Sequence, residues 1–184
     1  MIFTRTKDQE VLFTSDWWSR TLKDEPKLIA WLQKLQQTEI GGYDDYMEFI
    51  RRFEPEERTH RIFTNIALDE QKHSGIIIGV LHERGRSISK IQMPSTYWSS
   101  MNEHITDLQT AAAVNYFGEA LAAFRFEVIL DHPETPADLK EMLSIILPDE
   151  QFHRETLMRL AGNDKLEEFA LHHHAAVAAL KGIK

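Results

Sequence analysis

The stretch that decides the fold is Ile66-Ala67-Leu68-Asp69-Glu70-Gln71-Lys72-His73, because the chain repeats it as Ile146-Leu147-Pro148-Asp149-Glu150-Gln151-Phe152-His153. Five of the eight positions are identical. The spacing between the two copies, from Glu70 to Glu150, also separates Glu39 from Glu119, so each of these glutamates precedes the glutamate of its motif by the same interval. The chain therefore contains, twice, a single glutamate followed by a Glu-x-x-His pair.

Residues three apart share one face of an α-helix, so each Glu-x-x-His pair would point a carboxylate and an imidazole the same way. Two such helices, with one glutamate from each of two partner helices, supply the ligands that four-helix bundles use for a two-metal carboxylate site. The candidate metal ligands are Glu39, Glu70, His73, Glu119, Glu150 and His153.

Hydrophobic periodicity and the positions of Pro and Gly predict five helices, over residues 26–53, 55–84, about 99–131, 135–161 and 164–181. Residues 1–25 would be a lead-in with a short helix from Ser15, and residues 85–98 a crossover that can travel the length of a bundle. We expect one all-α domain over residues 1–184, a four-helix bundle with a core at 26–161 and a C-terminal fifth helix.

Each pair of glutamates would face across its own hairpin. The midpoint of Glu39 and Glu70 falls at the break before Pro55, and the midpoint of Glu119 and Glu150 falls between two prolines. A third motif, Glu57-x-x-His60, would lie roughly 220° around the helix from Glu70. We interpret it as accidental.

The alternative to a metal site is a bundle with buried salt bridges. Four inward glutamates would then need cations, and the inward stripes offer two histidines and no nearby Lys or Arg. Four carboxylates in one dry layer repel one another, and two divalent cations are the simplest remedy. An aspartate precedes each Glu-x-x-His. We expect Asp69 to accept a hydrogen bond from His153 and Asp149 to accept one from His73, because metal-bound histidines usually donate to a carboxylate.

Composition narrows the remaining possibilities. The chain has no cysteine, which excludes disulfides, thiolate metal sites and a cysteine nucleophile. A net charge of −8 argues against a general nucleic-acid binder. We find neither a membrane-spanning apolar run nor a secretory signal, and expect a cytoplasmic protein. The adjacent histidines 172–174 point in three directions on a helix, so they cannot share one ion, and we expect them at the surface or partly packed.

The ligand pattern resembles the ferritin-like di-iron carboxylate superfamily over residues 26–161. The resemblance implies that Glu39 and Glu119 are terminal ligands, that Glu70 and Glu150 bridge two metals, and that each histidine holds one ion. Two iron ions are the first expectation and a mixed Mn/Fe pair the second. Gln71 stands where bacterioferritins often carry a haem-ligating Met, so we expect no haem. Rubrerythrins usually add a Cys-rich rubredoxin module and an extra carboxylate ligand. Neither is evident here, so an external electron donor would be needed.

Three functional hypotheses follow. The first is an oxidoreductase that activates O2 or peroxide, with an unidentified small molecule as a candidate substrate and Tyr43 or Tyr116 giving a proton or an electron. Packing is the simpler role for each tyrosine. The second is a ferroxidase that stores iron in a large hollow assembly, whereas a monomer or homodimer would favour the first. The third is a metal-binding bundle without catalysis.

Overall fold

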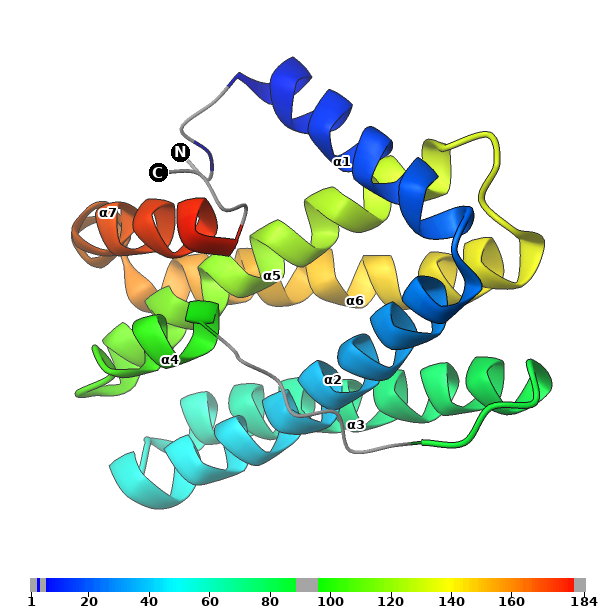
Figure 1. Ribbon diagram of the computed structural model, residues 1–184. Coiled ribbons are helices and arrows are strands. Elements are labelled where there is room, and N and C mark those ends of the chain that lie inside the picture. The colour runs from blue at the N-terminus through cyan, green and yellow to red at the C-terminus, as the bar shows by residue number, and fades with distance from the viewer. Residues whose placement is uncertain (1–2, 4–5, 89–95, 181–184) are drawn as a thin grey trace. The chain divides into compact units, whose positions relative to one another are not determined.

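The computed structural model describes residues 3, 6–88 and 96–180, and in these residues the chain is all-α (Figure 1). The described part holds no strand and seven helices: α1 (Lys7–Leu22), α2 (Glu25–Phe53), α3 (Glu57–Glu83), α4 (Thr96–Asn102), α5 (Leu108–Asp131), α6 (Ala137–Ala161) and α7 (Asn163–Leu180). The predicted all-α class is confirmed. The helices expected at 26–53, 55–84, 135–161 and 164–181 correspond to α2, α3, α6 and α7, with ends within about two residues.

The chain divides into two compact units, with boundaries that fall within α1, α5 and α6. The first, which we call the α2–α3 unit, comprises residues 14–93 and 128–146. The second, the α4–α7 unit, comprises residues 1–13, 94–127 and 147–184. A single ferritin-like domain over residues 1–184 stays a prediction.

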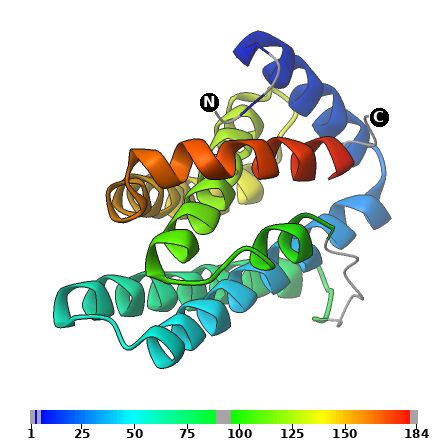
Figure 2. The ribbon, with the colours of Figure 1, turned by 90° about the vertical axis from the view of Figure 1, so that its left-hand side faces the viewer.

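Helices α2 and α3 form the antiparallel hairpin of the first unit and lie side by side along their length (Figure 2). The Asp24 side chain caps α2 by accepting a hydrogen bond from the Lys27 backbone N–H at 3.2 Å. The chain reverses at Glu54, whose φ of 43° is left-handed, directly before Pro55. The predicted break between the helices is therefore confirmed.

Helix α1 begins at Lys7, well before the predicted start at Ser15. The Thr6 backbone N–H donates to Gln9 Oε1 at 3.2 Å, and the Gln9 N–H donates to Thr6 Oγ1 at 3.3 Å. This reciprocal capping box satisfies backbone donors at the start of α1. Farther along α1, Trp18 is fully buried and its Nε1–H donates to Thr135 Oγ1 at 2.7 Å.

The helix predicted to begin near residue 99 is in fact two helices, α4 and α5. Asp107 ends the intervening loop because its Oδ1 accepts from the Thr110 backbone N–H at 2.8 Å. The Thr110 hydroxyl in turn accepts from the Asp107 N–H at 2.9 Å. These two bonds start α5 at Leu108 rather than continuing α4.

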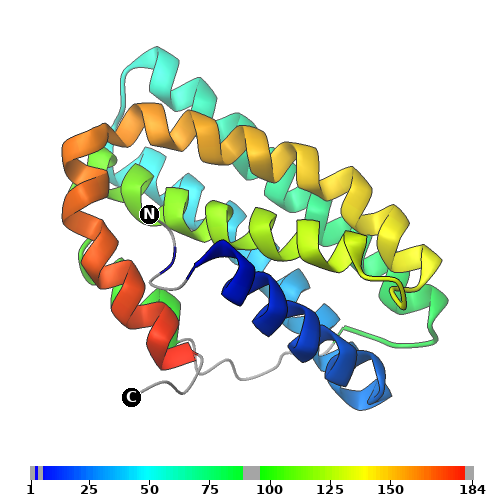
Figure 3. The ribbon, with the colours of Figure 1, turned by 90° about the horizontal axis from the view of Figure 1, so that it is seen from above.

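The helix ends at Gly85 and Gly162 use a backbone conformation that side chains disfavour. Gly85, just after α3, has φ 67°, and Gly162, between α6 and α7, has φ 75°. Figure 3 shows the sharp change of direction from α6 to α7. Of the predicted crossover, residues 89–95 lie outside the described residues.

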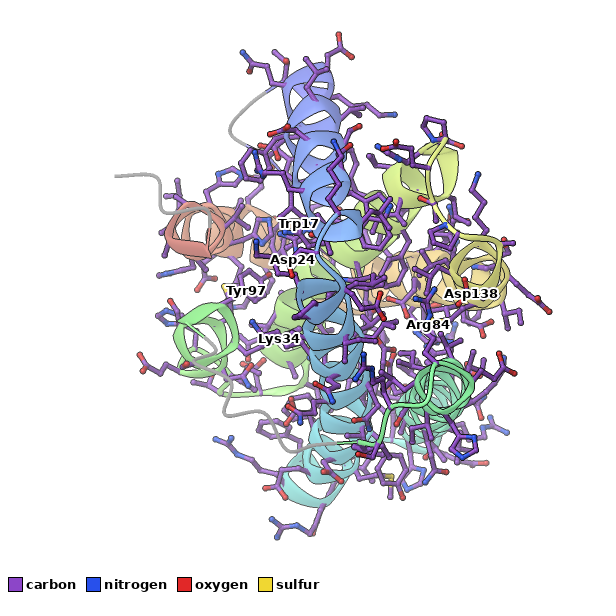
Figure 4. All side chains as sticks on the ribbon, turned by 45° about the vertical axis from the view of Figure 1, so that its right-hand side comes forward. Trp17, Asp24, Lys34, Arg84, Tyr97 and Asp138 are labelled. Atoms are coloured by element: carbon purple, nitrogen blue, oxygen red, sulfur yellow. The ribbon has the colours of Figure 1, made fainter. Side chains whose placement is uncertain are left out.

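Arg84, at the end of α3, pairs with Asp138 in the first turn of α6 inside the α2–α3 unit (Figure 4). Asp138 Oδ2 accepts from the guanidinium Nε at 2.8 Å and lies 2.6 Å from its Nη2, so one carboxylate oxygen joins the two helices. Among the described residues, no helix is both long and apolar enough to cross a lipid bilayer.

Candidate metal centre

The α2–α3 unit brings together Glu39, Glu70 and His73, which we call the first cluster. One ligand atom from each lies within 4.8 Å of the others. The three side chains are buried, with exposed fractions of 4%, 6% and 0%. His73 Nδ1 lies 3.2 Å from Glu39 Oε2, so these two atoms converge on a common point across the hairpin. The predicted pairing of Glu39 with the Glu70 motif is present in space.

Two neighbours shape the first cluster. Gly42 leaves space for the Glu70 carboxylate, since a Cβ at that position would lie only 3.2 Å from Glu70 Cγ. Gln36, one turn before Glu39, is buried and its Nε2 donates to Ser74 Oγ at 3.0 Å. This hydrogen bond joins α2 to α3 beside His73 and fixes the hairpin at the level of the cluster.

The α4–α7 unit brings together Glu119 of α5 with Glu150 and His153 of α6, which we call the second cluster. One ligand atom from each again lies within 4.8 Å of the others. All three side chains are buried, His153 completely. Close to Glu150, the Gln151 amide donates to Glu127 Oε1 at 2.9 Å and ties α6 to α5.

The second cluster has different surroundings from the first. Trp98 of α4 lies against Gly118, where an added Cβ would overlap Trp98 Cη2. Nearby, Tyr116 and Arg154 line a surface cavity of about 440 Å³, together with Glu155, Met158 and Arg159. The Arg159 guanidinium lies 3.6 Å from the Glu155 carboxylate.

The donor chemistry of each cluster fits a divalent transition metal. Each offers two carboxylates and one imidazole, a donor set that suits iron or manganese. Carboxylates buried this close repel one another, and a divalent cation between them removes the repulsion. In the first cluster, His73 points Nδ1 at Glu39 Oε2, so its Nε2 is directed toward a different partner.

The other predicted residues fall into three groups. Glu57 and His60 are exposed, which agrees with their interpretation as an accidental motif. Tyr43 and Tyr116 are half-buried. Asp69 and Asp149 are also half-buried, and their hydrogen bonds to the histidines stay a prediction.

The prediction for the three adjacent histidines is wrong at His173, and the buried Gln36 beside the first cluster was not predicted. His173 is completely buried rather than at the surface or partly packed, and it contacts the phenol of Tyr97. Gln36 was not predicted to be buried because hydrophobic periodicity identifies only apolar residues on the inward face. Its position one turn before Glu39 on the inward face was the available sign.

Comparison with known proteins identifies one family. The Rubrerythrin family matches residues 31–161, which is well over half of the chain and includes all six predicted ligands. The match confirms the ferritin-like four-helix bundle predicted from the repeated motif. Searches of curated proteins and of solved structures each found no match.

Proposed function

Because the chain belongs to the rubrerythrin family of ferritin-like di-iron proteins, we propose that it reduces peroxide at a centre of two iron ions. The observation that carries the proposal is the pair of buried clusters, each with two carboxylates and one imidazole. Rubrerythrins typically reduce peroxide. Conversion of one hydrogen peroxide to two waters takes two electrons and two protons.

The residue roles follow the repeat. Glu39 and His73 would hold one ion, Glu119 and His153 the other, and Glu70 and Glu150 would bridge them. The equal spacing in the two halves and the family membership support this assignment. When bound, the two ions would supply electrons for cleaving the O–O bond and positive charge for the oxygens that leave. Asp69 and Asp149 would hold the two imidazoles in one tautomer by accepting their other N–H.

The protein side chains would supply exclusion of water and delivery of protons. All six ligands are buried, so the charges they carry act in a medium of low dielectric constant. Tyr116 lies on α5, one turn before Glu119 of the second cluster, and with Arg154 it lines a surface cavity of about 440 Å³. We assign this cavity as the entry for peroxide and protons, with the Tyr116 hydroxyl as a proton donor. Tyr43 of α2 is the second candidate for a proton donor.

Electrons must come from outside the chain. The sequence has no cysteine, so it cannot hold a rubredoxin-type iron centre of its own. A reduced partner protein or small-molecule reductant would therefore restore the centre after each peroxide. A mixed Mn/Fe pair would use the same six ligands, and elemental analysis of protein purified from its own host distinguishes the two compositions.

The decisive experiment combines metal analysis with peroxide consumption. We expect two iron ions per chain after anaerobic reconstitution with Fe(II), and rapid oxidation of that protein by peroxide in a stopped-flow instrument. Glu150→Ala should lower occupancy of both positions, because a bridging ligand serves both ions, whereas His153→Ala should mainly weaken one. Glu57→Ala is the matched control, since it removes the glutamate of an exposed Glu-x-x-His motif.

A ceiling of one ion or none would contradict the assignment of ligands. If the protein instead consumed O2 faster than peroxide and accumulated a ferric mineral in a large assembly, the function would be iron storage. Equal loss of metal in Glu57→Ala and Glu150→Ala would show that the loss reflects general surface acidity rather than the buried clusters.

A further inference from the structure

Two buried side chains of the α4–α7 unit form a hydrogen-bonded pair that the proposed function does not use. Tyr97 lies on α4, where Figure 4 labels it, and His173 lies on α7. The Tyr97 hydroxyl is 2.9 Å from His173 Nδ1. Their exposed fractions are 5% and 0%, so bulk water does not separate the phenol from the imidazole. The distance is short enough for a proton to pass directly between them.

The pair is packed against the segment of α5 that ends at Glu119. Phe117 stacks on the His173 ring, with centroids 4.5 Å apart and planes at 18°. The next residue, Gly118, lies under Trp98, whose ring meets Tyr97 edge to face at 5.2 Å. His173 thus contacts Phe117 directly, and Tyr97 is linked to Gly118 through Trp98. Phe117 and Gly118 immediately precede Glu119, a proposed ligand of the second cluster.

Charge and burial keep the Tyr97 phenol protonated. Burial raises the pKa of Tyr97 well above its usual value, the positive charge of Arg125 opposes that rise, and the Glu119 carboxylate adds to it. A neutral phenol that loses an electron becomes a strong acid, so its oxidation in a buried site needs a base within hydrogen-bonding distance. His173 Nδ1 is placed to be that base.

The neighbouring charges bear on where the proton can rest. Burial lowers the pKa of Arg125, while Tyr97 and the buried Glu10 raise it. Charges of opposite sign therefore act on the Tyr97 phenol: that of Arg125 favours loss of the phenolic proton, and that of Glu119 opposes it.

We propose that Tyr97 and His173 form a redox-active pair that passes single electrons from an external donor to the metal centre. The proposal rests on the proposed function, which supplies the oxidant, peroxide that meets an iron centre holding only one of the two electrons that its reduction needs. Tyr97 gives the second electron, its O–H bond breaks, and the proton goes to His173 Nδ1. This leaves a neutral tyrosyl radical beside an imidazolium. One electron from the donor and return of the proton restore the phenol, so each cycle adds one electron to the reduction of peroxide, and the two protons for water come from solvent.

The test uses the full chain loaded with Zn²⁺, which occupies carboxylate and imidazole sites without redox chemistry. A ruthenium tris(bipyridine) photo-oxidant with persulfate removes single electrons, and freeze-quenched EPR spectra measure the tyrosyl radical. The chain has four tyrosines, at positions 43, 46, 97 and 116. We expect Tyr97→Phe to lose most of the tyrosyl signal, whereas Tyr116→Phe, the matched control, should retain it.

The role of the base is tested separately. His173→Phe retains an aromatic ring against Phe117 and removes the proton acceptor. We expect the rate of Tyr97 oxidation to fall about tenfold, the scale set by one hydrogen bond. In the wild-type chain, the rate should also be lower in D2O than in H2O. A full tyrosyl signal in Tyr97→Phe, an unchanged rate in His173→Phe, or equal rates in the two solvents would overturn the proposal.

A second measurement separates this proposal from the proposed function. In the iron-loaded chain, one round of peroxide reduction by stored electrons should be the same in wild type and Tyr97→Phe, while steady turnover with a chemical reductant should slow in the variant. Equal steady turnover in both would overturn the relay. Failure of the wild type to reduce peroxide would overturn the proposed function, while the radical measurements on the Zn²⁺ form would still decide whether Tyr97 and His173 are a redox pair.

Discussion

Gly42→Ala should strengthen α2 and weaken metal binding at the same time. Alanine in a helix interior is more stable than glycine by about 0.5–1 kcal/mol. The added Cβ, however, would lie 3.2 Å from Glu70 Cγ and 3.4 Å from Glu70 Oε2. Carbon atoms in ordinary contact are about 3.5–4.0 Å apart. The Glu70 side chain must therefore move by a few tenths of an ångström.

A displacement of this size is at least as large as the variation in ligand distance that metal sites allow. Ligand distances in functional sites stay within about 0.2 Å of their ideal values. Because Glu70 is proposed to bridge both ions, we expect Gly42→Ala to reduce metal affinity about tenfold, a loss on the scale of a disturbed supporting residue. Gly41→Ala is the matched control, since a Cβ at Gly41 has no atom within 4 Å and should gain the same helix stability without disturbing Glu70.

Two assays measure the two effects independently. Urea unfolding of the metal-free proteins gives the stability change, and titration with Fe(II) or Co(II) against a chromophoric chelator gives the affinity. Both alanine variants should unfold at higher urea than the wild type, and only Gly42→Ala should bind metal more weakly. Equal metal affinity in the two variants would refute the claim that Gly42 is required by the Glu70 carboxylate.

Three further predictions concern stability. Gly118→Ala should destabilise the chain by about 1–3 kcal/mol, because its Cβ would overlap Trp98 Cη2, and Trp98→Leu should reduce that cost in thermal unfolding of the double variant. Asp107→Ala should cost about 0.5–2 kcal/mol of stability at pH 7, because it removes the cap of α5. Hydrogen bonds from Thr110 lower the pKa of Asp107 below 3.8, so its charged form stabilises the folded chain above that lowered value. Urea unfolding should therefore show the stability difference between wild type and variant shrinking as the pH falls through it. Burial raises the pKa of Asp45 to about 6, and the charges of Asp44 and Glu48 add to the rise. The charged form of Asp45 is therefore disfavoured in the folded chain. Asp45→Asn should raise the melting temperature above pH 6 and leave it unchanged below pH 3.8.

The parts of the fold that could be predicted from the sequence are those governed by local physics. Pro55 and the left-handed Glu54 end the first hairpin where the midpoint of Glu39 and Glu70 had placed the turn. The clustering of the proposed ligands could be predicted because a carboxylate in an apolar stripe is costly without a partner, and the repeat supplied two such stripes. Two capping boxes could also have been recognised in the sequence, at Thr6 with Gln9 and at Asp107 with Thr110. They would have predicted the observed starts of α1 and α5.

Contacts between distant elements could not be predicted in the same way. Periodicity shows which face of a helix is buried, but it does not name the partner on that face. Tyr97 and His173 are 76 residues apart, and their sequence neighbourhoods carry no shared pattern. The contact of Trp98 with Gly118 has the same character, because a glycine in a helix leaves open which side chain will use the space.

The repeat itself hides the difference that matters most for chemistry. The spacing that carries one motif onto the other also carries Gln36 onto Tyr116 and Ser74 onto Arg154. In the first half, Gln36 and Ser74 form a buried hydrogen bond of 3.0 Å across the hairpin. In the second half, Tyr116 and Arg154 line a cavity of about 440 Å³. The two clusters therefore have the same proposed ligands but different neighbours. Beside the first cluster lies the hydrogen bond between the Gln36 amide and the Ser74 hydroxyl. At the corresponding positions of the second half, the Tyr116 phenol and the Arg154 guanidinium line a cavity. Under the proposed function, peroxide and protons would enter on the side of the cavity, so Tyr116 and Arg154 are the side chains that would meet them.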